Sequence, residues 1–258
     1  MSTTGYETLL IDRADGVVTA TLNRPHRKNA CTVRMFDELA AIAREVRDTQ
    51  DDRVLVLTGA GDGFCSGVDL LELPTDGTDT VQRASAAVLE LYSLPKPTIT
   101  ALNGVAAGVG VGIGLCTDLV LAADSARIIM SFVKRALSPD GGTSWLLPKL
   151  VGLRKAKELA FFGDPLSAPE AAELGLINRV VPGDKLMELT REWANRLADG
   201  PRTALATTKI MLNDADNVTI AQAIEREYLS QKYNAGTADM KEAITAFREK
   251  REPVFRNL

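Results

Sequence analysis

Asp140 is the side chain that the sequence marks most clearly for acid–base chemistry. It lies in the sequence SPDGGTSW, with Pro139, Trp145 and Leu146 as apolar neighbours. One carboxylate can take a proton from one carbon and return it to another. Desolvation by apolar neighbours would raise its pKa and make it a better base near neutrality. Pro-Asp-Gly-Gly is also typical of a turn, in which the aspartate bonds the backbone or caps a helix beginning near Thr143. The local sequence leaves both interpretations open.

A second feature is the nearly apolar run GVAAGVGVGIGLCTD at 104–118, which has glycine at every second position from Gly108 to Gly114. Glycine allows the backbone to approach another group closely, but each one weakens a helix or strand by roughly 0.5–1 kcal/mol relative to alanine. The spacing does not fit the G-x-G-x-x-G fingerprint of dinucleotide-binding proteins. The run indicates either tight packing of a helix on a sheet or bare backbone close to a ligand.

The composition argues against several classes of protein. The chain has 258 residues, of which 45% are hydrophobic, and its net charge of −4 argues against a nucleic-acid-binding surface. Its three cysteines have no C-x-x-C spacing and His26 is its only histidine, so neither a zinc site nor a disulfide framework is indicated. We expect no metal site. The basic sequence NRPHRKNA around His26 is typical of a solvated loop.

The sequence shows no targeting or membrane segment. Its first ten residues lack the basic start and apolar core of a signal peptide. No apolar run reaches the ~18–20 residues that span a membrane. We therefore expect a cytoplasmic protein that has no membrane partner.

The elements that must position these residues follow an α/β pattern. Alternating apolar and polar residues at 8–12 and 17–23 flank Asp15-Gly16, which predicts a β-hairpin. Thr32 is a candidate N-cap for an amphipathic helix that ends near Asp48. Further strands are expected at short apolar runs, and further helices where apolar residues recur at helical spacing. The expected strands cover 54–57, 98–102, 119–123 and 128–131, and the expected helices cover 81–94, 154–162, 169–174, 185–198, 203–213, 220–235 and 238–251.

The order of these elements predicts an α/β core with parallel strands, followed by a mainly helical part from Thr143 onward. We place the core at 1–195 and a C-terminal helical region at 196–258. Short amphipathic helices need a surface to pack against, so we expect a neighbouring subunit to cover them.

Five segments together resemble the enoyl-CoA hydratase/isomerase, or crotonase, superfamily. They are NRPHRKNA (23–30), GAGDGFCSGVDL (59–70), KPTITALNGVAAGVGVG (96–112), SPDGGTSWLLPKLVG (138–152) and AAELGLINRVV (171–181). The resemblance extends over nearly the whole chain. It implies a crotonase-like spiral of ββα units with a C-terminal helical trimerisation region, assembled as a homotrimer or as a hexamer made of two trimers. It also implies an acyl-coenzyme A thioester as substrate and no separate cofactor.

Two backbone N–H groups carry the chemistry that this resemblance implies. Removing a proton next to a thioester carbonyl builds negative charge on the carbonyl oxygen, and N–H groups aimed at that oxygen stabilise the charge. By resemblance, one donor is Val68, just before the aspartate of the SGVD sequence. The other is Val109, which lies between Gly108 and Gly110.

The resemblance also implies residues that bind coenzyme A. Arg27 or Lys28 is expected near the phosphates, because cationic side chains suit them electrostatically. The residues expected around the adenine are Ser66, Asp69 and Leu70. Lys250 is expected to approach the phosphates of a bound ligand, in its own or a neighbouring subunit.

The chain departs from the hydratases of this family in its carboxylates. Those enzymes hold a water between two glutamates, at positions that correspond here to Gly112 and, about, Phe132. No Asp or Glu occurs from 103 to 117 or from 126 to 139. Asp140, in contrast, resembles the aspartate of the dienoyl-CoA isomerases and of the ring-epoxide isomerase of phenylacetate degradation. The sequence therefore favours an enoyl-CoA isomerase with Asp140 as proton shuttle.

Two alternatives stay open. A hydratase could use a carboxylate from Glu72, Asp79 or the C-terminal helices, or the chain could bind acyl-CoA without catalysis. The segment 74–80 and the helix after it are expected to shape the pocket for the acyl group.

Overall fold

The computed structural model describes residues 5–72 and 78–255, and this part of the chain contains two sheets. The larger sheet has the order β1-β2-β3-β5-β7-β10, and the smaller has the order β4-β6-β8-β9. The strands of the larger sheet are β1 Leu9–Ala14, β2 Val17–Leu22, β3 Val54–Gly59, β5 Thr98–Leu102, β7 Leu119–Ala123 and β10 Arg179–Val181. Those of the smaller sheet are β4 Gly63–Cys65, β6 Val105–Ala107, β8 Arg127–Ile129 and β9 Leu166–Ser167.

The helices belong to two groups, one in the core and one in the C-terminal region. Those of the core are α1 Val33–Asp48, α2 Thr78–Tyr92, α3 Val109–Leu115, α4 Thr143–Val151, α5 Leu153–Phe162, α6 Ala168–Glu173 and α7 Leu186–Ala198. Those of the C-terminal region are α8 Arg202–Asn213, α9 Ile220–Ala235 and α10 Ala238–Glu249.

The core repeats one structural unit three times. In the units β3-β4-α2, β5-β6-α3 and β7-β8-α4, the first strand joins the larger sheet and the second joins the smaller one. Strands from successive units pair in parallel, as β3 does with β5 and β4 with β6. The predicted spiral of ββα units is therefore confirmed.

Local sequence explains how the chain enters this spiral. The predicted hairpin forms between β1 and β2, and its turn residues Asp15 and Gly16 have φ of 52° and 78°, as a tight hairpin turn requires. The predicted cap is also present, since the Thr32 hydroxyl accepts a hydrogen bond from the Met35 N–H at the start of α1.

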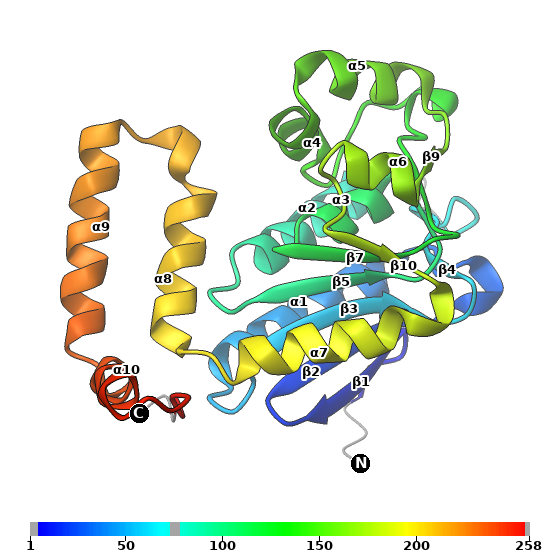
Figure 1. The fold of residues 1–258 in the computed structure, drawn as a ribbon. Coiled ribbons are helices and arrows are strands. Elements are labelled where there is room, and N and C mark those ends of the chain that lie inside the picture. Colours follow the sequence, from blue (N-terminus) through cyan, green and yellow to red (C-terminus); the bar gives the residue numbers. More distant parts are fainter. Residues whose placement is uncertain (1–4, 73–77, 256–258) are drawn as a thin grey trace.

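Helices cover both faces of the larger sheet (Figure 1). On one face, a hydrophobic core includes Phe36 of α1, Leu91 of α2 and Ile113 of α3. On the other face, α7 places Leu186 and Ala194 against β3, β5 and β7. Helix α7 packs on the sheet along its length and ends at Ala198, so the predicted boundary between 195 and 196 falls inside a helix of the core.

The glycine run forms β6 and α3. Every second residue of α3 is glycine, so the helix forms although its sequence predicts a weak one. Close contacts explain the difference, because a Cβ on Gly110 would lie 2.4 Å from the Cys65 carbonyl oxygen. One on Gly112 would lie 2.2 Å from the Gly141 carbonyl oxygen. Contacts this short exclude any side chain, so packing against neighbouring backbone offsets the low helix propensity of glycine.

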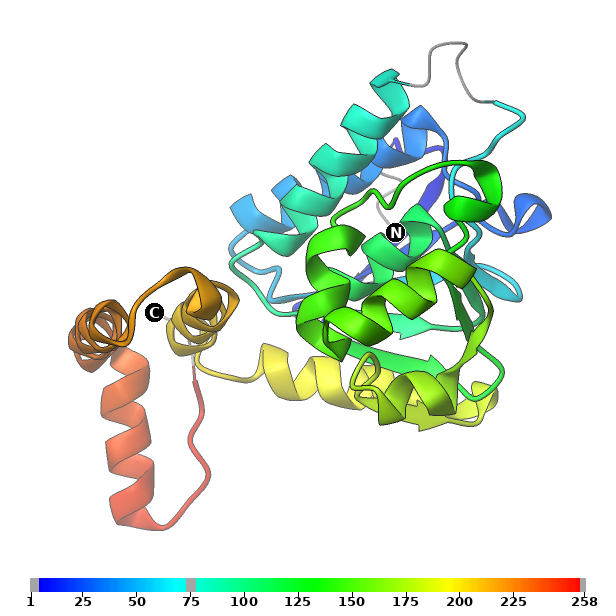
Figure 2. The same cartoon turned by 90° about the horizontal axis from the view of Figure 1, so that it is seen from above.

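The C-terminal helices α8, α9 and α10 lie beside the core (Figures 1 and 2). The Lys209 ammonium of α8 holds this region to the core through an ion pair of 2.9 Å with Asp118 and a hydrogen bond to the Lys96 carbonyl. Many large apolar side chains of these helices are exposed: Ile210, Leu212, Ile220, Ile224, Tyr228, Leu229, Tyr233 and Phe247. Such a surface is consistent with the predicted neighbouring subunit, which stays a prediction. No helix among the described residues is long and apolar enough to cross a bilayer.

Candidate active site

The site lies where β4 and β6 end, because these neighbouring parallel strands deliver both predicted N–H donors to the same edge of the smaller sheet. Val68 follows β4 by three residues, and Val109 follows β6 by two. The two segments are in contact, since a Cβ on Gly67 would lie 3.1 Å from the Ala107 carbonyl oxygen. The structure thus brings together two residues that are 41 positions apart in the sequence.

Both N–H groups are free to bind a ligand. Cys31 and Val68 form a parallel bridge in which the Cys31 N–H donates to the Gly67 carbonyl and the Asp69 N–H donates to the Cys31 carbonyl. The Val68 N–H therefore points to the opposite side of its segment. Val109 is the first residue of α3, where N–H groups have no acceptor within the helix. Among the described residues, neither N–H has a protein acceptor.

Gly108 allows the turn that aims the second donor. Its φ of 54° and ψ of −128° lie in a region that side chains exclude, so only glycine can connect β6 to α3 in this way. The loop that carries Asp140 then packs directly onto Val109. A Cβ on Gly141 would lie 2.8 Å from Val109 Cγ2.

Asp140 has the surroundings of a proton-transfer group. Burial raises its pKa from the ordinary 3.8 to about 6. Its Oδ1 is buried and has no hydrogen-bond partner among the described residues. Thr143 donates through both its N–H and its hydroxyl to the Asp140 backbone carbonyl, and the N-cap of α4 is Gly142. The carboxylate therefore does not cap the helix, which was one of the two interpretations of this aspartate.

Neither of the two glutamate positions of the hydratases can supply a carboxylate here. Gly112 is packed against the Gly141 carbonyl and has no room for a side chain. Phe132 is 5% exposed, and its ring lies 4.0 Å from a Cβ placed on Gly108, so an apolar group faces the site instead. Of the alternative carboxylates, Glu72 is bonded to Arg24 at 2.5 Å and Asp79 to Arg83 at 3.3 Å.

Three of the residues predicted to bind coenzyme A lie together beside β4. The Ser66 N–H donates to the Lys28 carbonyl at 3.0 Å, and its hydroxyl donates to the Arg27 carbonyl at 3.2 Å. Arg27 and Lys28 are both exposed, and the Lys28 ammonium pairs with Asp62. The structure thus places the backbone of Arg27 and Lys28 beside Ser66, whereas the Lys28 side chain lies against Asp62 and Gly63 at the start of β4.

The remaining three predicted binding residues differ in their surroundings. Leu70 is 52% exposed, next to the donor segment. Asp69 is 5% exposed, its carboxylate bonds to Arg24 and to the Leu71 N–H, and its backbone N–H and carbonyl bond to Cys31 and Glu72, so its hydrogen-bonding groups are used within the chain. Lys250 follows α10 in the C-terminal region, which leads away from the core of the same chain (Figure 2).

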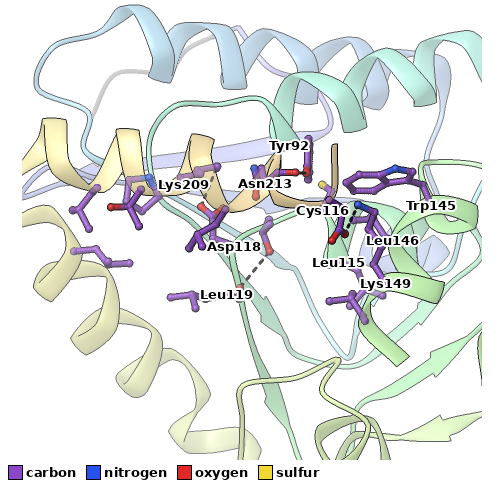
Figure 3. Close-up of a pocket in the computed structure, with 18 residues that line it drawn as sticks. Tyr92, Leu115, Cys116, Asp118, Leu119, Trp145, Leu146, Lys149, Lys209 and Asn213 are labelled. Atoms are coloured by element: carbon purple, nitrogen blue, oxygen red, sulfur yellow. Dashed lines mark hydrogen bonds and ion pairs between the residues drawn. The ribbon is translucent and has the colours of Figure 1, made fainter. Parts of the chain in front are cut away.

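An apolar groove begins at Gly142, two residues after Asp140, and runs between α2 and α4. It has a volume of 390 Å³ and is lined by Ser85, Val88, Leu89, Tyr92, Cys116, Gly142, Trp145 and Leu146. Tyr92 and Trp145 pack edge to face at 5.5 Å and also line a second cavity of 540 Å³ between α4 and α8 (Figure 3). Of the segment 74–80 predicted to shape the acyl pocket, 74–77 lie outside the described residues, whereas the groove is bounded by the helix that follows.

Sequence reasoning missed Arg24, although it is 9% exposed and bonds to Asp69 beside Val68. It also missed two amides that join loops below the site. Asn29 and Asn103 both donate to the Gly63 carbonyl, at 2.7 and 3.2 Å. Part of the signal was present, because Arg24 and Asn103 follow closely on the ends of β2 and β5, but such residues are equally common in solvated turns, and Asn29 lies within the loop that follows β2.

Within the described residues, two N–H groups without a protein acceptor lie near one end of the smaller sheet, and the loop that carries Asp140 packs onto the second of them. Such an arrangement can bind a carbonyl oxygen and take a proton from a neighbouring carbon. A family model described as Enoyl-CoA hydratase/isomerase matches residues 12–257. The chain therefore belongs to the enoyl-CoA hydratase/isomerase family, as the sequence predicted.

Relatives in this family are called both isomerases and hydratases. The chain is 39% identical over 248 residues to the 1,2-epoxyphenylacetyl-CoA isomerase of Escherichia coli, covering 93% of this chain and 95% of the relative. It is 36% identical to a probable enoyl-CoA hydratase of Rhodobacter capsulatus, covering 97% and 98%. The crystal structure of an enoyl-CoA hydratase from Bacillus anthracis superimposes with a TM-score of 0.94 at 31% identity, covering 98% of this chain and all of that one.

Proposed function

We propose that this protein is an enoyl-CoA isomerase that moves a double bond within an acyl-coenzyme A thioester. The observation that carries the proposal is the single desolvated carboxylate of Asp140, one residue from the Gly141 contact with Val109. One carboxylate suffices for proton transfer between two carbons, whereas the hydratases of this family use two to hold a water.

The proposed reaction conserves all atoms of the substrate. The Asp140 carboxylate removes a proton from the α carbon of a 3-enoyl thioester, and the C–H electron pair forms an enolate whose charge rests on the thioester oxygen. The N–H groups of Val68 and Val109 stabilise that charge. The protonated Asp140 then returns the proton to the γ carbon, which gives the 2-enoyl thioester and restores the carboxylate.

Incubation with 3-enoyl-CoA and with 2-enoyl-CoA tests the proposal. We expect the double bond of 3-enoyl-CoA to migrate, detected by the absorbance of the conjugated thioester. We expect no comparable gain of water by 2-enoyl-CoA, detected by an added mass of one water. Hydration as fast as migration would contradict the single-carboxylate mechanism. Tight binding without turnover of any thioester would support a non-catalytic acyl-CoA-binding protein instead.

In this proposal coenzyme A enters only as part of the substrate. Its phosphates would lie near Arg27 and Lys28, and its adenine near Ser66 and Leu70. Lys250 would then serve the site of another subunit in a trimer or hexamer, because α10 leads away from its own core (Figure 1). The exposed apolar side chains of α8, α9 and α10 support such an assembly.

The groove between α2 and α4 is proposed to hold the acyl group, since it begins at Gly142, two residues from Asp140. Leu89→Trp would fill this groove from α2, where Leu89 is 63% exposed. We expect kcat/KM to fall by about tenfold or more for long or ring-bearing acyl groups and to change by less than about twofold for a four-carbon acyl group. Ring-bearing thioesters belong in this panel because the Escherichia coli relative is named an epoxyphenylacetyl-CoA isomerase.

The control is Val81→Trp, which enlarges an exposed side chain of the same helix outside the groove. It should leave the acyl-group preference unchanged. If Leu89→Trp lowers kcat/KM equally for all acyl groups, the acyl group does not occupy this groove.

A further inference from the structure

Arg24 is a buried cation that no step of the proposed reaction uses. Its side chain is 11% exposed. The guanidinium donates to the Ala30 carbonyl at 2.7 Å, to Asp69 Oδ2 at 3.0 Å and to Glu72 Oε1 at 2.5 Å. One side chain therefore donates to three acceptors from two separate segments. It serves contacts within the protein and is largely covered.

These two segments are the ones that form the bridge at Val68. On one side, Ala30 directly precedes Cys31. On the other side, Asp69 directly follows Val68. The bridge itself consists of only two backbone hydrogen bonds, of 2.7 and 2.8 Å, on either side of Val68. Arg24 ties together the residues next to this bridge.

The electrostatics match this arrangement. Desolvation tends to raise the pKa of Asp69, but the Leu71 N–H and Arg24 outweigh it and hold the pKa below its ordinary value. Asp69 is therefore charged when it meets Arg24, and each buried charge compensates the other. Removing one partner would leave an uncompensated charge beside the donor segment.

We propose that Arg24 is a positioning residue of the oxyanion site: by clamping Ala30 to Asp69 it fixes the segment that aims the Val68 N–H at the thioester oxygen. This inference rests on the proposed function, because it takes the Val68 N–H as a donor to the thioester. It also assigns the Asp69 carboxylate to binding Arg24 rather than to binding the adenine.

Lysine cannot replace arginine in this role. The guanidinium presents several N–H donors in a rigid planar fork, whereas an ammonium is a compact point charge on a flexible stem. Arg24→Lys therefore keeps the charge beside Asp69 but cannot hold acceptors on both segments in one fixed geometry. The substitution separates positioning from charge compensation.

The test compares Arg24→Lys with the wild-type protein. We expect kcat for isomerisation to fall about 10- to 100-fold, which is less than the loss of a whole oxyanion donor, while KM changes by less than about threefold. The pH dependence set by Asp140 should not move. The C=O stretching band of a bound saturated acyl-CoA with a ¹³C-labelled carbonyl should shift back toward its frequency in solution, because the carbonyl is less polarised.

Arg83→Lys is the matched control, since Arg83 of α2 makes two exposed ion pairs, with Asp37 of α1 and with Asp79, and contacts neither Val68 nor the residues that Arg24 holds. It should change neither kcat nor the carbonyl band. If Arg24→Lys does not fold, Asp69→Asn removes the charge but keeps an acceptor for Arg24, and it should produce the same changes to a smaller extent.

The outcomes distinguish this inference from the proposed function. A carbonyl band equally shifted in wild type and in Arg24→Lys would overturn the positioning role, even if the protein is an isomerase. If the wild type polarises the bound carbonyl but isomerises no thioester, the proposed function fails. Loss of that polarisation in Arg24→Lys would then still support the positioning role.

Discussion

Asp140→Asn is expected to lower kcat for double-bond migration by about 10²–10⁴-fold while KM for the thioester changes little. Asparagine has nearly the same shape as aspartate but cannot accept the proton. The measurement is the rate of conversion of 3-enoyl-CoA to 2-enoyl-CoA at saturating substrate. Asp164→Asn, which alters an exposed ion pair with Lys134, should leave the rate unchanged. An Asp140→Asn protein with undiminished migration would show that another group carries the proton.

The pH dependence should report the same carboxylate. Because only the ionised form accepts a proton, kcat/KM should rise with pH through about 6 and level off above it. Stability should change in the opposite direction. The folded-state pKa of Asp140 lies above its ordinary 3.8, so the folded state binds more protons and wild-type stability falls as pH rises from about 4 to about 6. Asp140→Asn lacks this loss and should be the more stable protein above pH 6, as measured by urea unfolding.

Gly112→Ala is expected to have the largest effect on stability. Its new methyl group would lie 2.2 Å from the Gly141 carbonyl oxygen, a backbone atom that can move only together with the Asp140 loop. We expect a loss of ~3 kcal/mol or more in the free energy of unfolding and a loss of isomerase activity, because overpacking of a rigid contact displaces the backbone. Urea unfolding and the migration assay measure the two effects.

Gly114→Ala is the matched substitution one half-turn later in α3. Its methyl group would lie 3.4 Å from the nearest atom, in Phe64, which is ordinary contact. Alanine is the better helix former, so stability should stay within ~1 kcal/mol of wild type. If Gly112→Ala is as stable to urea as Gly114→Ala, the contact with Gly141 does not limit the residue at position 112. Gly112→Glu should likewise produce an unstable protein and not a hydratase.

Sequence patterns predicted most of the larger sheet and its helices because their signals are local. The strands at 98–102 and 119–123 have the sequences TITAL and LVLAA, which hold no charged residue and are mainly apolar or β-branched, and they match β5 and β7 to the residue. The helix at 220–235 was equally clear from its apolar spacing. The smaller sheet was predicted only in part, since β4, β6 and β8 have three residues each and β9 has two. Strands this short carry no recognisable alternation.

The candidate site shows the same limit. Sequence motifs identified Val68, Val109 and Asp140, and the structure places the Val109 segment in contact with each of the other two. The turn interpretation of Asp140 could not be rejected from sequence, because only the fold shows that its Oδ1 is buried and has no partner in the part of the chain that the structure describes. The role of Arg24 was hidden for a related reason. Its three acceptors come from residues up to 48 positions away, and no local pattern encodes such contacts.

The position of the exposed apolar helices in the sequence has a consequence for biosynthesis. Chain synthesis proceeds from the N-terminus, and β10 completes the larger sheet at Val181. The helix α7, which covers its second face, is synthesised before α8. Domains generally fold as units during synthesis, N-terminal parts first. The exposed apolar side chains of α8, α9 and α10 are therefore made after every element of the core, which gives the core time to fold before they could associate with it.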